Sequence, residues 1–299
     1  MTTLTALIKR NMKLFFKDKG MFFTSLITPA ILLVLYATFL ADVYRDSILL
    51  GLPKELLLPE KVINGCVGGQ LLSSLLAVSC VTVSFCSNFL MVQDKVTGVR
   101  SDLMMSPVKS STMALGYYVS ATLSTLLVCF VAMGLCFVYM AINGWYLSVL
   151  DVLLICGDVV LLVTFGTALS SIINYFLTSQ GQISAVGTIV SSGYGFICGA
   201  YMPISQFGSG LQTVLSFFPG TYGTALLKNH AIRGALAEMG KLGVPNESIL
   251  ELKKAIDGSF TFMGAEVSVW GMFAVMLIWV VALLSAYVLL NRYGKRMKK

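Results

Sequence analysis

Long uncharged runs alternate with short charged stretches along the chain. Residues 62–92 and residues 110–150 carry no charged side chain, and a compact charged segment, residues 93–109, lies between them. A membrane-spanning helix needs about 20 predominantly apolar residues, and the helices of soluble cores have shorter apolar runs. The pattern therefore predicts an all-α integral membrane protein.

Six stretches are long and apolar enough to predict transmembrane helices in a single domain, residues 1–299. They are, approximately, residues 21–41, 62–92, 111–140, 148–176, 183–202 and 267–291. An outer loop is expected over residues 42–61. The second stretch contains many Ser and Thr residues, which allow close packing and hydrogen bonds between helices. Packing is the favoured interpretation, and the alternative is a translocation path lined by Ser84 and Asn88.

The first residues predict a helix that lies in the membrane interface. Residues 3–17 place Leu, Ile, Met and Phe side chains on one side and Lys and Arg side chains on the other, as interfacial amphipathic helices do. Asp18, Lys19 and Gly20 end this helix, so the interfacial segment covers residues 3–19. The alternative is a simple basic flank that only orients the first span.

The region after the fifth expected span is apolar but interrupted. Pro203, Pro219 and Gly220 divide it into two apolar segments, each too short to span comfortably. Irregular backbone is tolerated at membrane depth only where protein surrounds it or where it lines a water-filled cavity. We therefore expect a re-entrant hairpin and then a polar segment, within an outer region that covers residues 203–266.

Composition and charge placement indicate the class and the orientation. Only 12% of the 299 residues are charged and 57% are hydrophobic, whereas about 25% of the residues of a soluble domain are charged. Thirteen of the 21 Lys and Arg residues lie in the N-terminal segment, residues 93–109 and the C-terminal tail. The positive-inside rule then predicts that both termini are cytoplasmic. Basic residues placed in this way indicate contact with lipids of the cytoplasmic membrane rather than with nucleic acid.

One carboxyl group lies within an expected span. Asp158 is roughly a third of the way into the fourth span, where a charged residue costs roughly 2.5–3.5 kcal/mol on insertion scales, so its side chain is expected to face protein or water. Two interpretations remain open. One is a group that senses substrate or protons, and the other is a buried carboxyl hydrogen-bonded to a neighbouring span.

The sequence contains no recognisable motif for catalysis or metal binding. A Gly-x-x-x-x-Gly-Lys-Ser/Thr phosphate loop is absent, and a single histidine, His230, excludes a His-Glu-x-x-His zinc site. None of the seven cysteines forms a Cys-x-x-Cys pair, so we expect neither a disulfide framework nor a metal site. We expect a chain with no catalytic residues, no metal and no bound cofactor of its own.

The charged segment resembles the coupling region of the membrane subunit, or permease, of type-2 ABC exporters. That family carries a charged segment with a glycine after the second span, and a Ser-Pro or Thr-Pro step before the third. The matching residues here are Asp94, Lys95, Gly98, Ser106 and Pro107. The usual Glu-Arg or Glu-Lys opening of the family is replaced here by Gln93-Asp94-Lys95.

The similarity continues along nearly the whole chain. The basic amphipathic start, followed by a first span that contains Pro29, is similar to the elbow helix of the family. Two further stretches look like its outer re-entrant region. They are Gly199-Ala200-Tyr201-Met202-Pro203 and Leu215-Ser216-Phe217-Phe218-Pro219-Gly220-Thr221-Tyr222.

The resemblance implies an ATP-driven exporter that moves an amphipathic or hydrophobic substrate, such as a drug, a peptide or a lipid-like molecule. Two permease copies, identical or paralogous, would pair, and two separate ATPase subunits, which carry ATP and Mg²⁺, would dock from the cytoplasm. Residues 93–109 would then contain a coupling helix that contacts the ATPase. The residues implied in coupling are Asp94, Lys95, Gly98, Arg100, Asp102, Ser106 and Pro107.

Two functions from other classes remain as alternatives. The first is an ion-coupled secondary transporter in which Asp158 carries a proton or a cation, although the hydropathy shows no inverted repeat of the kind such transporters have. The second is a membrane scaffold or sensor whose outer segment binds a ligand.

Overall fold

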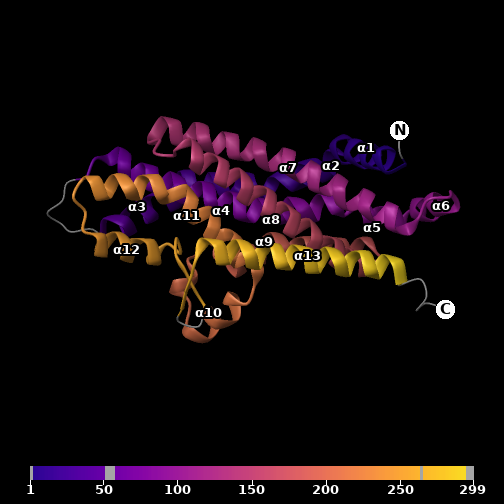
Figure 1. Ribbon diagram of the computed structural model, residues 1–299. Helices are drawn as coiled ribbons and strands as arrows, with labels where there is room; N and C mark the ends of the chain where they lie inside the picture. The colour runs from indigo at the N-terminus through magenta and orange to yellow at the C-terminus, as the bar shows by residue number, and fades with distance from the viewer. Residues whose placement is uncertain (1–2, 51–57, 263–264, 294–299) are drawn as a thin grey trace.

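The protein is an elongated bundle of helices in a computed structural model that describes residues 3–50, 58–262 and 265–293. The helix α1 (Thr3–Lys17), the helix α6 (Val99–Met105) and the C-terminal end of α13 (Val269–Tyr293) lie at one end, called here the α6 end. The helices α3 (Ala41–Leu50) and α12 (Asn246–Ala255) lie at the opposite end, called the α12 end (Figure 1). The expected all-α membrane architecture is confirmed.

The helix α4 (Glu60–Asn88) forms the centre of the bundle. It packs against α2 (Lys19–Leu35), α7 (Ser110–Asn143), α8 (Val149–Phe176) and α11 (Pro219–Lys241). Nearly every residue from Val62 to Asn88 is buried, and a helix that is apolar on all sides belongs in such an interior. The second expected span therefore carries the core of the molecule.

Five helical segments in the described part of the chain are long and apolar enough to cross a membrane. They are Lys19–Asp46, Glu60–Val96, Ser110–Asn143, Val149–Phe176 and Val269–Tyr293. The remaining expected span corresponds to α9 (Gln180–Ile197), a helix of 18 residues that is about 27 Å long at 1.5 Å per residue. Its Gly, Ser, Thr and Gln residues lower its hydropathy, which is why α9 is not among the five.

The first span continues further than the sequence predicts. A π-helical turn, Tyr36–Leu40, joins α2 directly to α3, so the chain is helical to Leu50 where an outer loop was expected from residue 42. The Tyr36 ring stacks on the Tyr44 ring at a centroid distance of 5.7 Å. This contact and others bury the first turns of α3 against α4, which explains why polar residues did not end the helix.

The interrupted region after α9 contains a short 3₁₀ turn, Ile204–Gln206, and two helices, α10 (Ser209–Ser216) and α11. Pro219 occupies the first position of α11, where a proline lacks no hydrogen bond. Gly223 packs against Leu162 in the middle of α8, and Gly234 packs against the backbone of Tyr146 beyond the end of α7. The helix α11 therefore begins at membrane depth and runs towards the α12 end.

The last part of the outer region is folded against these helices. It contains α12 and an antiparallel pair, β1 (Phe260–Phe262) and β2 (Ala265–Val267), in which Phe260 pairs with Val267. Asp257, which precedes β1, has a φ of 54°, and its carboxylate accepts hydrogen bonds from the backbone N–H groups of Ile204 and Ser205. One side chain thus fixes the 3₁₀ turn to the chain that follows α12.

Candidate functional site

The charged segment between α4 and α7 consists of two short helices rather than one. The helix α5 (Leu90–Val96) continues from α4, and α6 (Val99–Met105) follows after Gly98. Gly98 has a φ of 83°, a left-handed conformation that glycine adopts without the steric cost of a Cβ atom. The chain therefore turns at Gly98, and residues 93–109 contain two short helices in place of a single coupling helix.

Asp94 connects the charged segment to two other helices. Its carboxylate accepts hydrogen bonds from both terminal nitrogens of Arg10 on α1, at 2.7 and 3.0 Å, and from the Tyr117 hydroxyl on α7, at 2.5 Å. The residue is 4% exposed. The hydrogen bonds to Asp94 raise the pKa of the Arg10 guanidinium further above its ordinary value. The pair is bidentate, a geometry that adds orientation to charge attraction.

Lys95 connects the same segment to α8. Its Nζ donates hydrogen bonds to the backbone carbonyls of Asn174, Tyr175 and Leu177, at 2.8, 2.7 and 3.2 Å. The last carbonyls of a helix lack partners within the helix and carry partial negative charge. Lys95 therefore caps the C-terminal end of α8 from outside the helix.

The helix α6 has no buried residue and lies beyond the bundle at the α6 end (Figure 1). Arg100 donates a hydrogen bond of 3.4 Å to Asn291 on α13. Asp102, Ser106 and Pro107 are exposed, and Met105 is 86% exposed. One side of α6 is thus free to contact another molecule, while Leu103 and Met104 pack against the bundle. The preceding helix α5 is held to α1, α7 and α8 through Asp94 and Lys95, and α6 itself is held to α13 through Arg100.

Ser84 and Asn88 lie between helices and not along an open path. The Ser84 hydroxyl is 3.2 Å from the Thr167 hydroxyl, and the Asn88 amide donates to the hydroxyls of Ser170 and Ser171 at 3.0 and 2.8 Å. Both residues are at most 1% exposed. Their polar groups join α4 to α8, in line with the packing interpretation, and they do not line the cavity described below.

Asp158 is also buried, and its partner is a residue that the sequence did not single out for a site. The Nδ1 atom of His230 on α11 is 2.6 Å from Asp158 Oδ2. Two turns earlier on α8, Asp151 forms a capping box with Ser148 and pairs with Arg233 of α11 at 2.5 Å. A buried Asp–His hydrogen bond and an Asp–Arg ion pair therefore connect α8 to α11 in the half of the bundle towards the α12 end.

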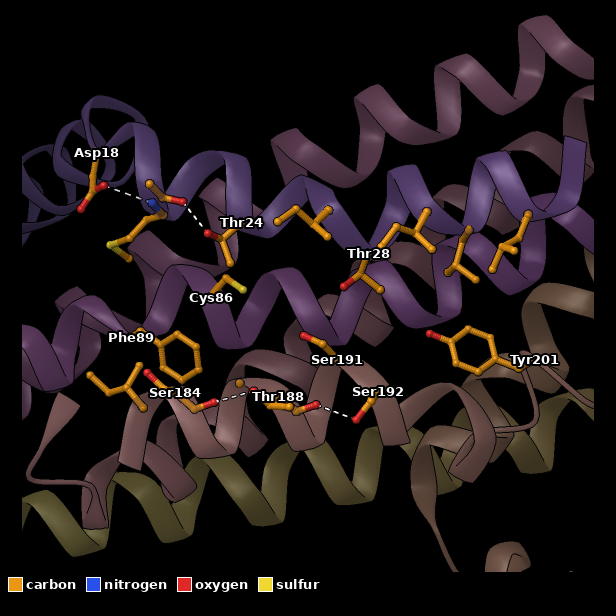
Figure 2. A pocket seen from close by; sticks show the side chains of 18 of the residues that line it. Asp18, Thr24, Thr28, Cys86, Phe89, Ser184, Thr188, Ser191, Ser192 and Tyr201 are labelled. Carbon is orange, nitrogen blue, oxygen red and sulfur yellow. Dashed lines mark hydrogen bonds between the residues drawn. The ribbon is translucent and has the colours of Figure 1, made fainter. Parts of the chain in front are cut away.

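A cavity of about 1040 Å³ lies between α2, α4 and α9 (Figure 2). It runs from Asp18 and Gln93 to Leu40 and Tyr201, with Ile and Leu side chains between. Its Ser and Thr residues come from α2 and α9. They are Thr24, Thr28, Ser184, Thr188, Ser191 and Ser192.

The cavity opens on the flank of the bundle. Ile27, Ile31 and Phe196, which line it, are 52%, 54% and 52% exposed in the single chain. Apolar side chains that are exposed along spans face lipid or another protein. The cavity is therefore a groove that a neighbouring molecule can close.

The breaks in the outer region have definite positions. Pro203 precedes the 3₁₀ turn, and Pro219 begins α11. Gly220 lies so close to the Tyr194 hydroxyl and the Phe218 ring that a Cβ atom would clash with both. Within the described residues, no group of three or more His, Cys, Asp or Glu side chains could hold a metal ion, and all seven cysteines are free.

The sequence points to several candidate residues but not to the residues that they contact in the structure. Arg10 and Tyr117 lie far from Asp94 in the chain, and no local pattern points to either contact. His230 carried a weak signal, because it stands with Lys228 and Arg233 in an otherwise apolar stretch. The pair between Asp151 and Arg233 also joins residues far apart in the chain, and no local pattern points to it.

Comparison with known families gives one match. Residues 2–229 match the sequence model of a family described as ABC-2 type transporter. The match covers the helices α1 to α9, the charged segment and most of the buried part of α11. Comparison with curated proteins gives no match.

Proposed function

The chain belongs to the ABC-2 type transporter family and is a multi-pass membrane permease, and on that premise we propose that it exports an amphipathic or hydrophobic substrate. The energy comes from ATP and Mg²⁺ on a separate ATPase subunit. The observation that carries this proposal is the segment α5–α6, in which the partly exposed helix α6 follows a helix that polar contacts connect to α1, α7 and α8, and α6 itself contacts α13. Such a segment is suited to transmit a displacement of α6 to the helices that it contacts.

In the proposed mechanism, α6 docks on the ATPase from the cytoplasm. A displacement of α6 acts on α1 and α7 through Asp94, and on α8 through Lys95. Nucleotide drives the change only if the ATP-bound ATPase prefers one of two permease conformations. The bidentate Arg10–Asp94 pair makes α1 and the base of the coupling segment move together.

The proposed assembly contains two permease copies and two ATPase subunits in the cytoplasmic membrane. Each permease crosses the membrane six times, with α9 as the fifth span and both termini in the cytoplasm. Support comes from the position of α1 and the end of α13 at the same end as α6 (Figure 1). The second copy closes the groove between α2 and α9, and the substrate moves through the enclosed space.

Charge reversal on α6 tests this proposal. In the assembled complex, Arg100→Glu or Asp102→Lys, and separately Gly98→Pro, should abolish stimulation of ATPase activity by the permease, while membrane insertion and yield stay unchanged. Lys254→Glu, an exposed charge reversal on α12 at the other end of the molecule, is the matched control and should retain full stimulation. Normal stimulation and transport in the α6 variants would overturn the coupling assignment.

A further inference from the structure

Lys228 is a buried lysine in the middle of α11. Its side chain is 1% exposed, and its Nζ donates a hydrogen bond of 2.7 Å to the Gly199 carbonyl just after α9. The same Nζ atom is 3.6 Å from Oδ2 of Asp257, in the chain between α12 and β1. A buried charge is strongly unfavourable unless it is paired and hydrogen-bonded. The ammonium group therefore holds the Gly199 backbone and the Asp257 carboxylate close to α11.

Asp257 extends this contact to the outer region. Its carboxylate also accepts hydrogen bonds from two backbone N–H groups of the 3₁₀ turn. Asn229, the next residue on α11, donates a hydrogen bond of 2.8 Å to the Gly258 carbonyl. The end of α9, the 3₁₀ turn and the turn before β1 thus meet at two consecutive residues of α11.

The helix α9 is held less firmly than α11. Three residues of α9 are buried, Ile183, Tyr194 and Gly195, whereas α11 is buried along most of its length. Two contacts with α8, made by His230 and Arg233, fix α11 further. A segment with few buried contacts opens at a lower cost in free energy than one in the core. The helix α11 is therefore the fixed support, and α9 is the element that can move.

The residues on either side of Gly199 line the groove at its α12 end. They are Phe196 and Tyr201, and Figure 2 shows the Tyr201 ring at that end of the groove. The two rings are in edge contact at a centroid distance of 5.1 Å, and a Cβ atom on Gly195 would clash with the Tyr201 ring. Because these groups pack together, the position of Gly199 sets the position of the groove wall.

We propose that Lys228 is a latch that holds the α12 end of α9 in place, and that its release lets this wall move away and open the groove at that end. The proposal rests on the proposed function, because the substrate of the proposed exporter leaves the groove at the α12 end. The latch has two states, since the ammonium group is either bound to Gly199 and Asp257 or hydrated. A position between the two would leave a buried charge without partners.

Hydrogen exchange of the purified full-length permease in nanodiscs tests the latch. Lys228→Met keeps the length of the side chain and removes its charge. Peptides that cover residues 196–207 should then exchange at least about tenfold faster, the ratio that corresponds to one lost hydrogen bond to a charged group. Exchange at the beginning of α9 and in α4 should stay unchanged. Lys254→Met, the same change at an exposed lysine of α12, is the control and should leave exchange of residues 196–207 unchanged.

Two further variants separate charge from shape. Lys228→Arg keeps the cation and should exchange more slowly than Lys228→Met, whereas a purely steric role predicts the reverse order, because arginine is the larger residue. Asp257→Asn removes the counter-charge and should speed exchange of the same peptides, also where Lys228→Met fails to fold. The two changes combined should have less than the sum of their effects, because both remove one contact.

Thiol labelling in whole cells tests the opening of the groove. Ser191 lines the middle of the groove, and Ser184 lines it towards the α6 end (Figure 2). Each is changed to Cys in a chain in which Cys86, which lines the groove, and Cys156, which is partly exposed, are replaced by Ala. A membrane-impermeant thiol reagent added outside should label Ser191→Cys faster when Lys228→Met is present. The labelling rate of Ser184→Cys should not change.

Unchanged exchange of residues 196–207 in Lys228→Met, or exchange that rises equally along the whole chain, would overturn the latch. Faster exchange without faster labelling of Ser191→Cys would overturn the opening of the groove. The exchange assay contains no ATPase, so its result is separate from the proposed function. If the latch behaves as expected but the chain has no ATPase partner, the export mechanism is wrong and the latch stands. If an ATPase partner is present but exchange is unchanged, only the latch is wrong.

Discussion

Asp94 is the residue at which the charged segment, residues 93–109, is fixed to α1 and α7. It is the acidic position where the chain departs from the usual family pattern, and it receives hydrogen bonds from Arg10 and Tyr117 on two different helices. The sequence differs from the family pattern here but still provides a carboxylate that accepts these hydrogen bonds. A buried carboxylate that accepts three hydrogen bonds is fixed in its orientation as well as in its position.

Replacement of Asp94 by Asn should lower both the stability of the protein and its stimulation of the ATPase. The variant leaves the Arg10 guanidinium without its counter-charge, so we expect a loss of about 1–3 kcal/mol in the free energy of unfolding, measured by thermal unfolding in detergent. Stimulation of the ATPase should fall by more than the loss of folded protein explains. Asp46→Asn on α3, which changes an exposed carboxyl, is the control and should change neither the stability nor the stimulation. Normal ATPase stimulation by Asp94→Asn would show that Asp94 has no role in the proposed mechanism.

At the scale of elements, the helices α8 and α11 are connected by a buried hydrogen bond and by an ion pair. Asp158 is hydrogen-bonded to His230, and Asp151 pairs with Arg233. Removing one partner of a buried hydrogen bond is costly, because the other polar group stays buried without a partner. This arrangement favours the structural interpretation of Asp158 over the ion-coupled one, since the carboxyl does not line the cavity.

Asp158→Asn and His230→Gln, alone and combined, decide between these interpretations. Each single variant should lose about 1–3 kcal/mol in stability, and the double variant should lose less than the sum, because the two residues act as one pair. Transport per folded molecule, driven by ATP without an ion gradient, should persist. Full stability of Asp158→Asn combined with lost transport would support the ion-coupled alternative, and Glu247→Gln on α12 serves as the control.

A helix could be predicted from the sequence where the hydropathy of consecutive residues determines it. The uncharged runs predicted five of the long apolar helices, because the length of an apolar run is a property of consecutive residues. The end of α11 could not be predicted in this way. Arg233 and Gly234 interrupt the apolar pattern, but Arg233 pairs with Asp151 and Gly234 allows close approach to Tyr146, so the helix continues to Lys241.

The candidate site was predictable only in its segment and not in its contacts. Residues 93–109 stood out because they are charged between uncharged runs. The partners Arg10 and Asp94 are 84 residues apart, and His230 and Asp158 are 72 apart. Contacts over such distances depend on how helices pack, which a single sequence does not record. The cavity was missed for the same reason, since its wall comes from three helices.

At the scale of the whole molecule, the proposed mechanism uses one path through connected parts. The partly exposed helix α6 lies at one end, the segment α5–α6 contacts α1, α7, α8 and α13, and the groove between α2 and α9 begins near the same end (Figure 1). The helix α1 leads directly into α2 after Asp18, so movement of the Arg10–Asp94 pair reaches one wall of the groove. An external source of energy acting on α6 is central to this account.

The most direct test is to purify the tagged chain from its native membrane in mild detergent and to identify by mass what accompanies it. The account predicts a stoichiometric partner that carries a phosphate-loop ATPase, and vanadate-sensitive ATPase activity in the purified complex. A chain that purifies alone, under conditions that keep another permease–ATPase complex intact, would contradict it.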